Sequence, residues 1–271
     1  MSTALVDGHR QETISVYDEG LLRGDGCFEA IRLYDGAVFA FTPHYQWLTR
    51  SAAALDIPCP PESELRAWVD ELAREGNDCI VRVVLTRGSG DRLPGRCIVL
   101  WQPLLPKVER LRLLPVAAPW HPGGERWELT GVKTISYAPN MAAGRLARCQ
   151  GFDDALLIST EGFVLEGPTF GILWIRRDGL IETPALNLGI LDSVTVRLLL
   201  AALAADGQRV VSGRFRLADV EQANEVVAVS TVKEVAPVVA IGQLSYSPAA
   251  FTNYLSGRHQ GMIEENKRVR T

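Results

Sequence analysis

A proline- and glycine-rich stretch, APWHPGGERWELTG at residues 118–131, divides the sequence near its middle. It has little apolar periodicity and separates two regions in which apolar runs alternate with turn signals. A chain of 271 residues is long enough for one large domain or two modest ones. We therefore predict that this stretch connects two separately folded parts.

The first part predicts strands interleaved with helices. Residues 27–38, CFEAIRLYDGAV, alternate apolar and polar positions around Asp35-Gly36, which predicts a β-hairpin. Thr42-Pro43 predicts the start of a helix that ends before Pro58. A second helix over 62–75 and two strands, CIVRVVLTR and RCIVLWQPL, should follow.

The second part carries similar signals. Asn140 should cap a helix that runs to Cys149, and Asp192-Ser193 should cap another that ends at Gly207. Hairpins are expected around residues 160–162 and around 178–179, and EVVAVST should form a buried strand. The polar tail after Tyr254 should be a solvated end.

Composition excludes several classes of protein. A net charge of -4 argues against a nucleic-acid partner. Neither the start MSTALVDGHRQET nor any apolar run predicts a signal peptide or membrane span. The five cysteines and four histidines lack the spacing of a disulfide framework or a metal site. We expect a soluble cytoplasmic protein with reduced cysteines and no metal.

Lysine is scarce, because only Lys107, Lys133, Lys233 and Lys267 are lysines among the 28 basic residues. Under such a bias a retained lysine is more often needed as an amine, which arginine cannot replace as a nucleophile. Lys133 lies among Val132, Ile135 and Tyr137, where partial desolvation would favour a neutral amine suited to imine chemistry. From position alone, a surface lysine at a strand end remains an alternative.

Two further features suggest ligand chemistry. The segment GILDSVT, residues 189–195, presents Ser193 and Thr195 at a helix N-terminus, which is either an anion site or a plain cap. Thr231, at a second hydroxyl-rich strand end, could line the same pocket. Glu166 in VLEGPTFG is either a surface group at a hairpin end or a buried partner for a positively charged heteroatom. The loops RGDG and RGSG lack the pattern of nucleotide-binding loops.

Six motifs in order, GDGCFEAIR, RGSGDR, VKTISYAPNM, DDALLISTEGFVLEGPTF, LDSVT and STVKEVAPV, resemble the class IV family of pyridoxal-phosphate enzymes. The resemblance covers about residues 15–245. It implies a two-domain α/β protein of fold type IV, with the cofactor pyridoxal 5'-phosphate at the domain interface. The expected divisions are a small N-terminal α/β domain over 1–118, a connection over 119–127 and a larger C-terminal α/β domain over 128–271.

The resemblance also implies roles for individual residues. Lys133 corresponds to the catalytic lysine that forms the internal aldimine, and Glu166 to the glutamate that keeps the pyridine nitrogen protonated. Tyr137 should lie near the phenolic oxygen of the cofactor. The backbone N–H of Val194 and the hydroxyls of Thr195 and Thr231 correspond to the phosphate site.

One departure from the family pattern concerns the phosphate. Members usually carry an arginine where this chain has Trp47. We expect Arg50, one turn later on the same helix face, to reach the phosphate instead.

The expected substrates are amino acids and 2-keto acids. Arg92 in RGSGDR stands where relatives place an arginine that binds a substrate carboxylate, and Phe28 is expected to line the substrate site. Ala30 fills a position that is commonly threonine in aminodeoxychorismate lyases, which favours an aminotransferase. A lyase that releases 4-aminobenzoate and pyruvate, and a degenerate member with weak or no catalysis, remain the alternatives. The resemblance further implies a homodimer.

Overall fold

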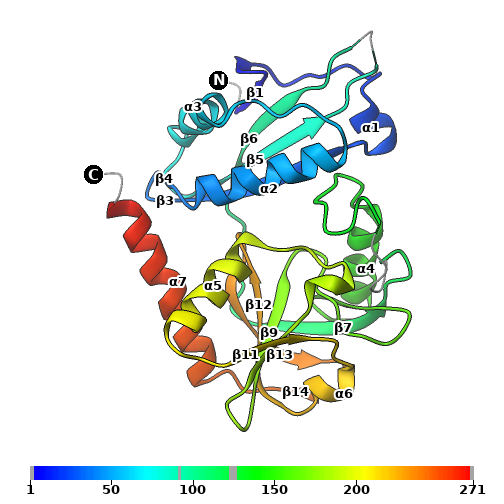
Figure 1. The fold of residues 1–271 in the computed structure, drawn as a ribbon, viewed down its shortest axis with the longest axis vertical. Coiled ribbons are helices and arrows are strands. Elements are labelled where there is room, and N and C mark those ends of the chain that lie inside the picture. Colours follow the sequence, from blue (N-terminus) through cyan, green and yellow to red (C-terminus); the bar gives the residue numbers. More distant parts are fainter. Residues whose placement is uncertain (1–2, 91–92, 122–126, 269–271) are drawn as a thin grey trace. The chain divides into compact units, whose positions relative to one another are not determined.

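The computed structural model describes residues 3–90, 93–121 and 127–268 and divides the chain into two compact units (Figure 1). The first unit comprises Met1–Pro106, Val132–Tyr137 and Met262–Thr271. The second comprises Lys107–Gly131 and Ala138–Gly261. The chain therefore passes from one unit to the other at residues 106–107, 131–132, 137–138 and 261–262. These divisions differ from the predicted boundaries at 118 and 127, because the second unit already begins at Lys107 and two later segments return to the first unit.

The first unit contains one antiparallel sheet in the described part of the chain, with strand order β2-β1-β6-β5-β3-β4. Its strands are β1 (Ala4–Val6), β2 (His9–Arg10), β3 (Gly26–Tyr34), β4 (Ala37–Val38), β5 (Cys79–Thr86) and β6 (Cys97–Pro103). Its helices are α1 (Glu19–Arg23), α2 (Phe41–Ala54) and α3 (Glu62–Ala73). The predicted hairpin is confirmed, since Asp35 and Gly36 both adopt positive φ between β3 and β4.

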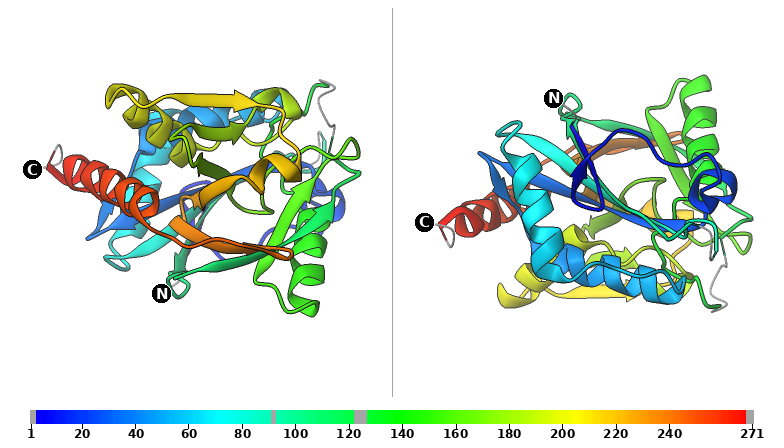
Figure 2. Two further views of the ribbon diagram at one scale, coloured as in Figure 1. Left: turned by 90° about the horizontal axis from the view of Figure 1, so that it is seen from below. Right: turned by 90° about the horizontal axis from the view of Figure 1, so that it is seen from above.

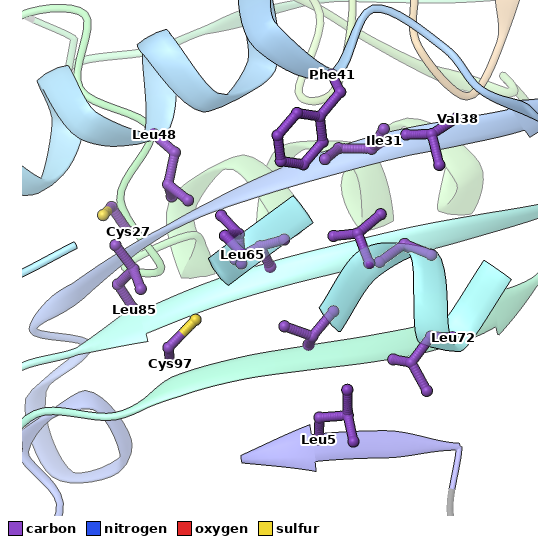
Figure 3. Close-up of a cluster of buried hydrophobic side chains, with 14 of the residues drawn as sticks. Leu5, Cys27, Ile31, Val38, Phe41, Leu48, Leu65, Leu72, Leu85 and Cys97 are labelled. Atoms are coloured by element: carbon purple, nitrogen blue, oxygen red, sulfur yellow. The ribbon is translucent and has the colours of Figure 1, made fainter. Parts of the chain in front are cut away.

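The core of the first unit lies between the sheet and helices α2 and α3 (Figure 3). Alternate strand residues such as Cys27, Ile31 and Leu85 meet Leu48 of α2 and Leu65 of α3. Phe28, Ala30 and Arg82 occupy the intervening positions, so they face the opposite side of the sheet. That side is free to carry chemistry because the core does not use it.

The second unit contains a mixed sheet in the described residues, with strand order β11-β10-β9-β12-β13-β7-β8 and β14 paired to β13. Its strands are β7 (Leu111–Ala117), β8 (Asp154–Ile158), β9 (Gly171–Arg176), β10 (Ile181–Pro184), β11 (Val210–Gly213), β12 (Ala223–Ser230), β13 (Glu234–Ile241) and β14 (Leu244–Ser245). Its helices are α4 (Ala138–Cys149), a 3-10 turn η1 (Leu186–Leu188), α5 (Val194–Ala205) and α6 (Leu217–Val220). Both faces of this sheet are buried, since neighbouring residues Leu156 and Leu157 belong to different core clusters.

The tail prediction is wrong. Residues 250–268 form the long helix α7 (Ala250–Arg268), drawn in red in Figures 1 and 2. Phe251, Leu255 and Ile263 are buried along it. Near its end, Lys267 pairs with Asp35. The buried position between Leu255 and Ile263 is His259, and this polar residue interrupts the apolar pattern that would predict a helix.

Two predicted helix caps are also misplaced. Helix α2 begins at Phe41, with Ala40 as its N-cap, so Thr42 and Pro43 lie inside its first turn. Proline is tolerated there because the first N–H groups of a helix have no partner within it. Asn140 likewise lies inside the first turn of α4, where its side chain accepts from Trp120 at 3.0 Å.

Candidate functional site

Lys133 lies on the short segment Val132–Tyr137, which pairs with the first residues of β3. The Phe28 N–H donates to the Lys133 carbonyl at 3.0 Å, and Cys27 forms an antiparallel bridge with Thr134. The Lys133 N–H donates to Ser51 Oγ of α2 at 3.3 Å. The backbone of Lys133 is therefore fixed by the sheet and by a helix packed on it.

The side chain of Lys133 is half-buried beside aromatic rings of the first unit. Its Nζ lies 4.7 Å from the centre of the Phe28 ring. Tyr137 meets the same ring edge-on, with centroids 5.4 Å apart. No carboxylate of the described residues pairs with Lys133. An amine held on an aromatic face without a counter-ion is suited to covalent chemistry.

Arg82 lies on the same face of the sheet, and sequence reasoning missed it. Its guanidinium carbon lies 4.9 Å from the Phe28 ring centre, and its Nε donates to Gln102 at 3.0 Å. Burial lowers the pKa of Arg82, while Tyr137 nearby raises it. An arginine in the middle of the apolar run CIVRVVLTR was the signal that could have revealed this residue.

Glu166 belongs to the second unit and is a buried carboxylate. Its carbonyl accepts from the Leu157 N–H at 2.9 Å, as expected for the predicted hairpin. Its side chain is 12% exposed, and both carboxylate oxygens lie 3.2 Å from the Leu191 N–H. His121 Nε2 lies 3.7 Å from Oε1. The Glu166 carboxylate is therefore mostly enclosed and is not a surface group, and its role as the partner of a positively charged heteroatom stays a prediction.

The hydroxyls of Thr195 and Thr231 meet at the N-terminus of α5. Their Oγ1 atoms lie 3.2 Å apart. Ser193 is the N-cap, but its side chain makes no hydrogen bond to the first turn of α5 in the described structure. The N–H groups of that turn, including Val194, are therefore donors for an anion. The segment from Leu191 to Thr195 joins this end to the Glu166 carboxylate.

Lys233, for which the sequence pattern predicted no role, holds the turn that follows Glu166. Its Nζ donates to Thr169 Oγ1 at 2.9 Å and lies 3.7 Å from Asp154 Oδ2. Burial lowers the pKa of Lys233, and Asp154 raises it. Lys233 is thus a structural cation next to the proposed site.

The roles of the two predicted anion-binding arginines stay predictions. Arg50 is exposed, and its guanidinium carbon lies 4.6 Å above the ring of Trp47 on α2. Arg92 lies outside the described residues.

The Glu166 carboxylate and the polar groups at the N-terminus of α5 fit pyridoxal phosphate. A buried carboxylate suits a protonated pyridine nitrogen, and two hydroxyls at an uncapped helix end suit a phosphate. The Glu166 carboxylate has about four acceptor sites. In the described structure it receives one backbone N–H, so it can accept a further donor.

Residues 26–241 match the family model of class IV amino-transferases. The chain belongs to this family, which uses pyridoxal 5'-phosphate and has a mixed α/β fold. The chain is therefore a pyridoxal-phosphate-dependent aminotransferase by family. The predicted family, fold class and cofactor are confirmed.

Individual relatives span the whole family group. A Methanocaldococcus jannaschii protein provisionally named a branched-chain-amino-acid aminotransferase is 34% identical over 241 residues, covering 84% of this chain and 82% of its own. A Mycobacterium tuberculosis bifunctional aminodeoxychorismate lyase and D-amino acid transaminase is 31% identical, covering 79% and 81%. The fold IV transaminase CpuTA1 from Curtobacterium pusillum superimposes with a TM-score of 0.84 at 29% identity, covering 91% and 90%.

Proposed function

We propose that this chain moves an amino group between an amino acid and a 2-keto acid, with Lys133 as the reactive amine. The observation that carries the proposal is the segment Leu191–Thr195. It joins the buried Glu166 carboxylate to the hydroxyl pair of Thr195 and Thr231, the two polar ends that pyridoxal phosphate requires.

Each residue has a defined task. When bound, the cofactor supplies a protonated ring that draws electrons from the carbon losing its proton. Lys133 takes and returns that proton at Nζ, which requires a neutral amine. Glu166 holds the ring nitrogen, and Tyr137 lies near the phenolic oxygen.

The phosphate is anchored by donors at the N-terminus of α5 and by a cation from α2. Thr195, Thr231 and the N–H of Val194 bind it, as a helix N-terminus favours an anion. Arg50 supplies the cation that Trp47 cannot. Arg50→Met should then weaken pyridoxal-phosphate binding, while unchanged affinity would remove Arg50 from the site.

The substrate carries a carboxylate. Arg82 is a partly buried guanidinium on the face that holds Phe28 and Lys133, and it can bind a carboxylate in bidentate fashion. Arg92 stays our predicted second ligand of the substrate carboxylate, on the basis of the sequence motif RGSGDR. Phe28 forms the apolar wall beside Arg82 and Lys133.

An aminodeoxychorismate lyase activity is the second candidate, because a relative at 31% identity is named for both activities. Ala30, in place of threonine, favours transamination. Release of pyruvate and 4-aminobenzoate from aminodeoxychorismate without an amino acceptor would support the lyase and contradict our first choice.

The decisive experiment is a half-reaction. Protein loaded with pyridoxal 5'-phosphate should be yellow, and borohydride should trap the cofactor on Lys133. Single amino acids from an L and D panel should then convert the bound cofactor to its amine form. A protein that binds no cofactor would support the degenerate alternative.

We also propose a cytoplasmic homodimer. Support comes from Val16, Tyr17, Leu21 and Leu22, which are 58–71% exposed within eight residues and suit burial against a second copy. The five cysteines are free, as expected in a reducing compartment. No helix of the described residues is long and apolar enough to span a membrane. Light scattering that gives a monomer mass would contradict the dimer.

A further inference from the structure

His121 lies beside Glu166, and the sequence pattern gave no reason to select it. Its Nε2 is 3.7 Å from Glu166 Oε1, and the two side chains are 10% and 12% exposed. Both residues belong to the second unit. A contact between two buried ionisable side chains is costly unless each satisfies the other.

The hydrogen bonds around Glu166 leave a shortage of donors. Its two oxygens share the single N–H of Leu191 at 3.2 Å. An ionised carboxylate with about four acceptor sites needs more than one shared donor when buried. In the described part of the chain, His121 is the only ionisable side chain paired with it.

The ring of His121 also indicates which nitrogen carries the proton. Its Nδ1 is buried and has no hydrogen-bond partner in the described structure. A proton on Nδ1 would be a buried donor without an acceptor, so the proton belongs on Nε2, which faces Glu166. The histidine can then donate to the carboxylate as a neutral ring.

We propose that His121 is a positioning residue that donates from Nε2 to Glu166 and orients its carboxylate toward the pyridine nitrogen. This inference rests on the proposed function of Glu166. The separation of 3.7 Å should shorten when cofactor binds, since catalytic hydrogen bonds often tighten in the loaded enzyme.

The first test uses protein without cofactor. The chain has four histidines, so ring nitrogens labelled with ¹⁵N give few signals, and His121→Phe identifies the one from His121. Glu166→Gln should shift the His121 signal toward that of an unpaired ring and leave the other three unchanged. An unmoved His121 signal would overturn the proposal.

The second test measures pyridoxal 5'-phosphate affinity and half-reaction rate. His121→Phe should lower the rate constant by about tenfold, the effect of one hydrogen bond to a charged group. His121→Gln, whose amide can donate from a similar position, should keep most of the wild-type rate constant. His9→Phe, a change at an exposed histidine, is the matched control and should have no effect.

A double-mutant cycle separates positioning from fold stability. If His121 acts through Glu166, His121→Phe should change the rate little in a Glu166→Gln background. Equal effects in both backgrounds, or loss of thermal stability alone, would overturn the proposal. Failure of the wild-type protein to bind cofactor would instead refute the proposed function.

Discussion

Glu225 gives the stability prediction that the structure defines best. It is 2% exposed on β12, the strand that ends just before Thr231. Its carboxylate accepts from the N–H groups of Ala249, Phe251 and Thr252 at 2.7, 2.9 and 3.0 Å, and from the Thr252 hydroxyl at 2.8 Å. These donors form the N-terminus of α7, so one side chain anchors the helix to the strand.

Glu225→Gln keeps the shape and removes the charge. Three of the donors bind Oε2 and one binds Oε1, so a glutamine oxygen can serve at most three. The amide NH₂ would then face the remaining N–H. Weakening three charged hydrogen bonds and leaving one donor unpaired should cost about 3 kcal/mol after relaxation.

The pH dependence gives a second readout. Burial raises the pKa of Glu225, but hydrogen bonds from Thr252, Phe251 and Ala249 outweigh burial, so the net pKa is below its ordinary 4.5. A depressed pKa contributes stability above the ordinary value, and the contribution is lost as pH falls through the folded-state pKa. The difference in unfolding free energy between wild type and Glu225→Gln should therefore be constant near neutrality and shrink below pH 4.5.

Urea unfolding at several pH values measures both effects, with Glu161→Gln at an exposed turn as the control. A loss below about 1 kcal/mol at neutral pH would show that the donors find other partners. If the difference in unfolding free energy stays unchanged in acid, the charge of Glu225 is not the cause of the difference.

Three further predictions concern the proposed site. Lys133→Ala should abolish the half-reaction while the circular dichroism spectrum stays native, since the Lys133 side chain contacts only the Phe28 ring among the contacts described; residual turnover would assign the proton transfer elsewhere. Arg82→Met should raise the KM for carboxylate substrates more than it lowers kcat, and equal losses in both would contradict a binding role. Lys233→Met should cost about 2 kcal/mol of unfolding free energy, because it leaves Asp154 buried without its cation, and Lys107→Met at an exposed site should cost almost nothing.

Local rules predicted those parts of the fold that local geometry determines. The hairpin at Asp35-Gly36 needs two residues with positive φ, and such residues identify a turn without reference to the rest of the chain. The strands β5, β6 and β12 were predicted because continuous apolar runs need burial.

Distant contacts explain the misplaced start of α2. The sequence favours Thr42 as its cap, but the helix begins after Ala40, which has no side chain for capping. Asn266 of α7 holds the chain just before the helix, because its Oδ1 accepts from the Ala40 N–H at 3.3 Å and its Nδ2 donates to the Val38 carbonyl at 3.1 Å. A contact made from 226 positions away cannot be predicted from neighbouring residues.

Some residues of the candidate site could be predicted from the sequence and others could not. Lys133, Glu166 and Thr195 could be selected because their motifs resemble those of a known family. His121 and Arg82 could not, since their importance comes from the side chains they meet, 45 and 54 positions from Glu166 and Phe28. A residue whose role depends on a contact that is distant in sequence is not marked by any local motif.

The chain has only four lysines, and their contacts in the structure show which of them suits the role of reactive amine. Lys107 is exposed, and Lys267 pairs with Asp35. Lys233 is mostly enclosed, with 17% of its side chain exposed, and burial lowers its pKa as imine chemistry would require, yet Thr169 and Asp154 hold its ammonium. Lys133 combines partial burial with an aromatic contact and no carboxylate in the described structure. A neutral amine is disfavoured wherever a carboxylate stabilises the cation, so the absence of a counter-ion, more than burial, distinguishes Lys133 from Lys233.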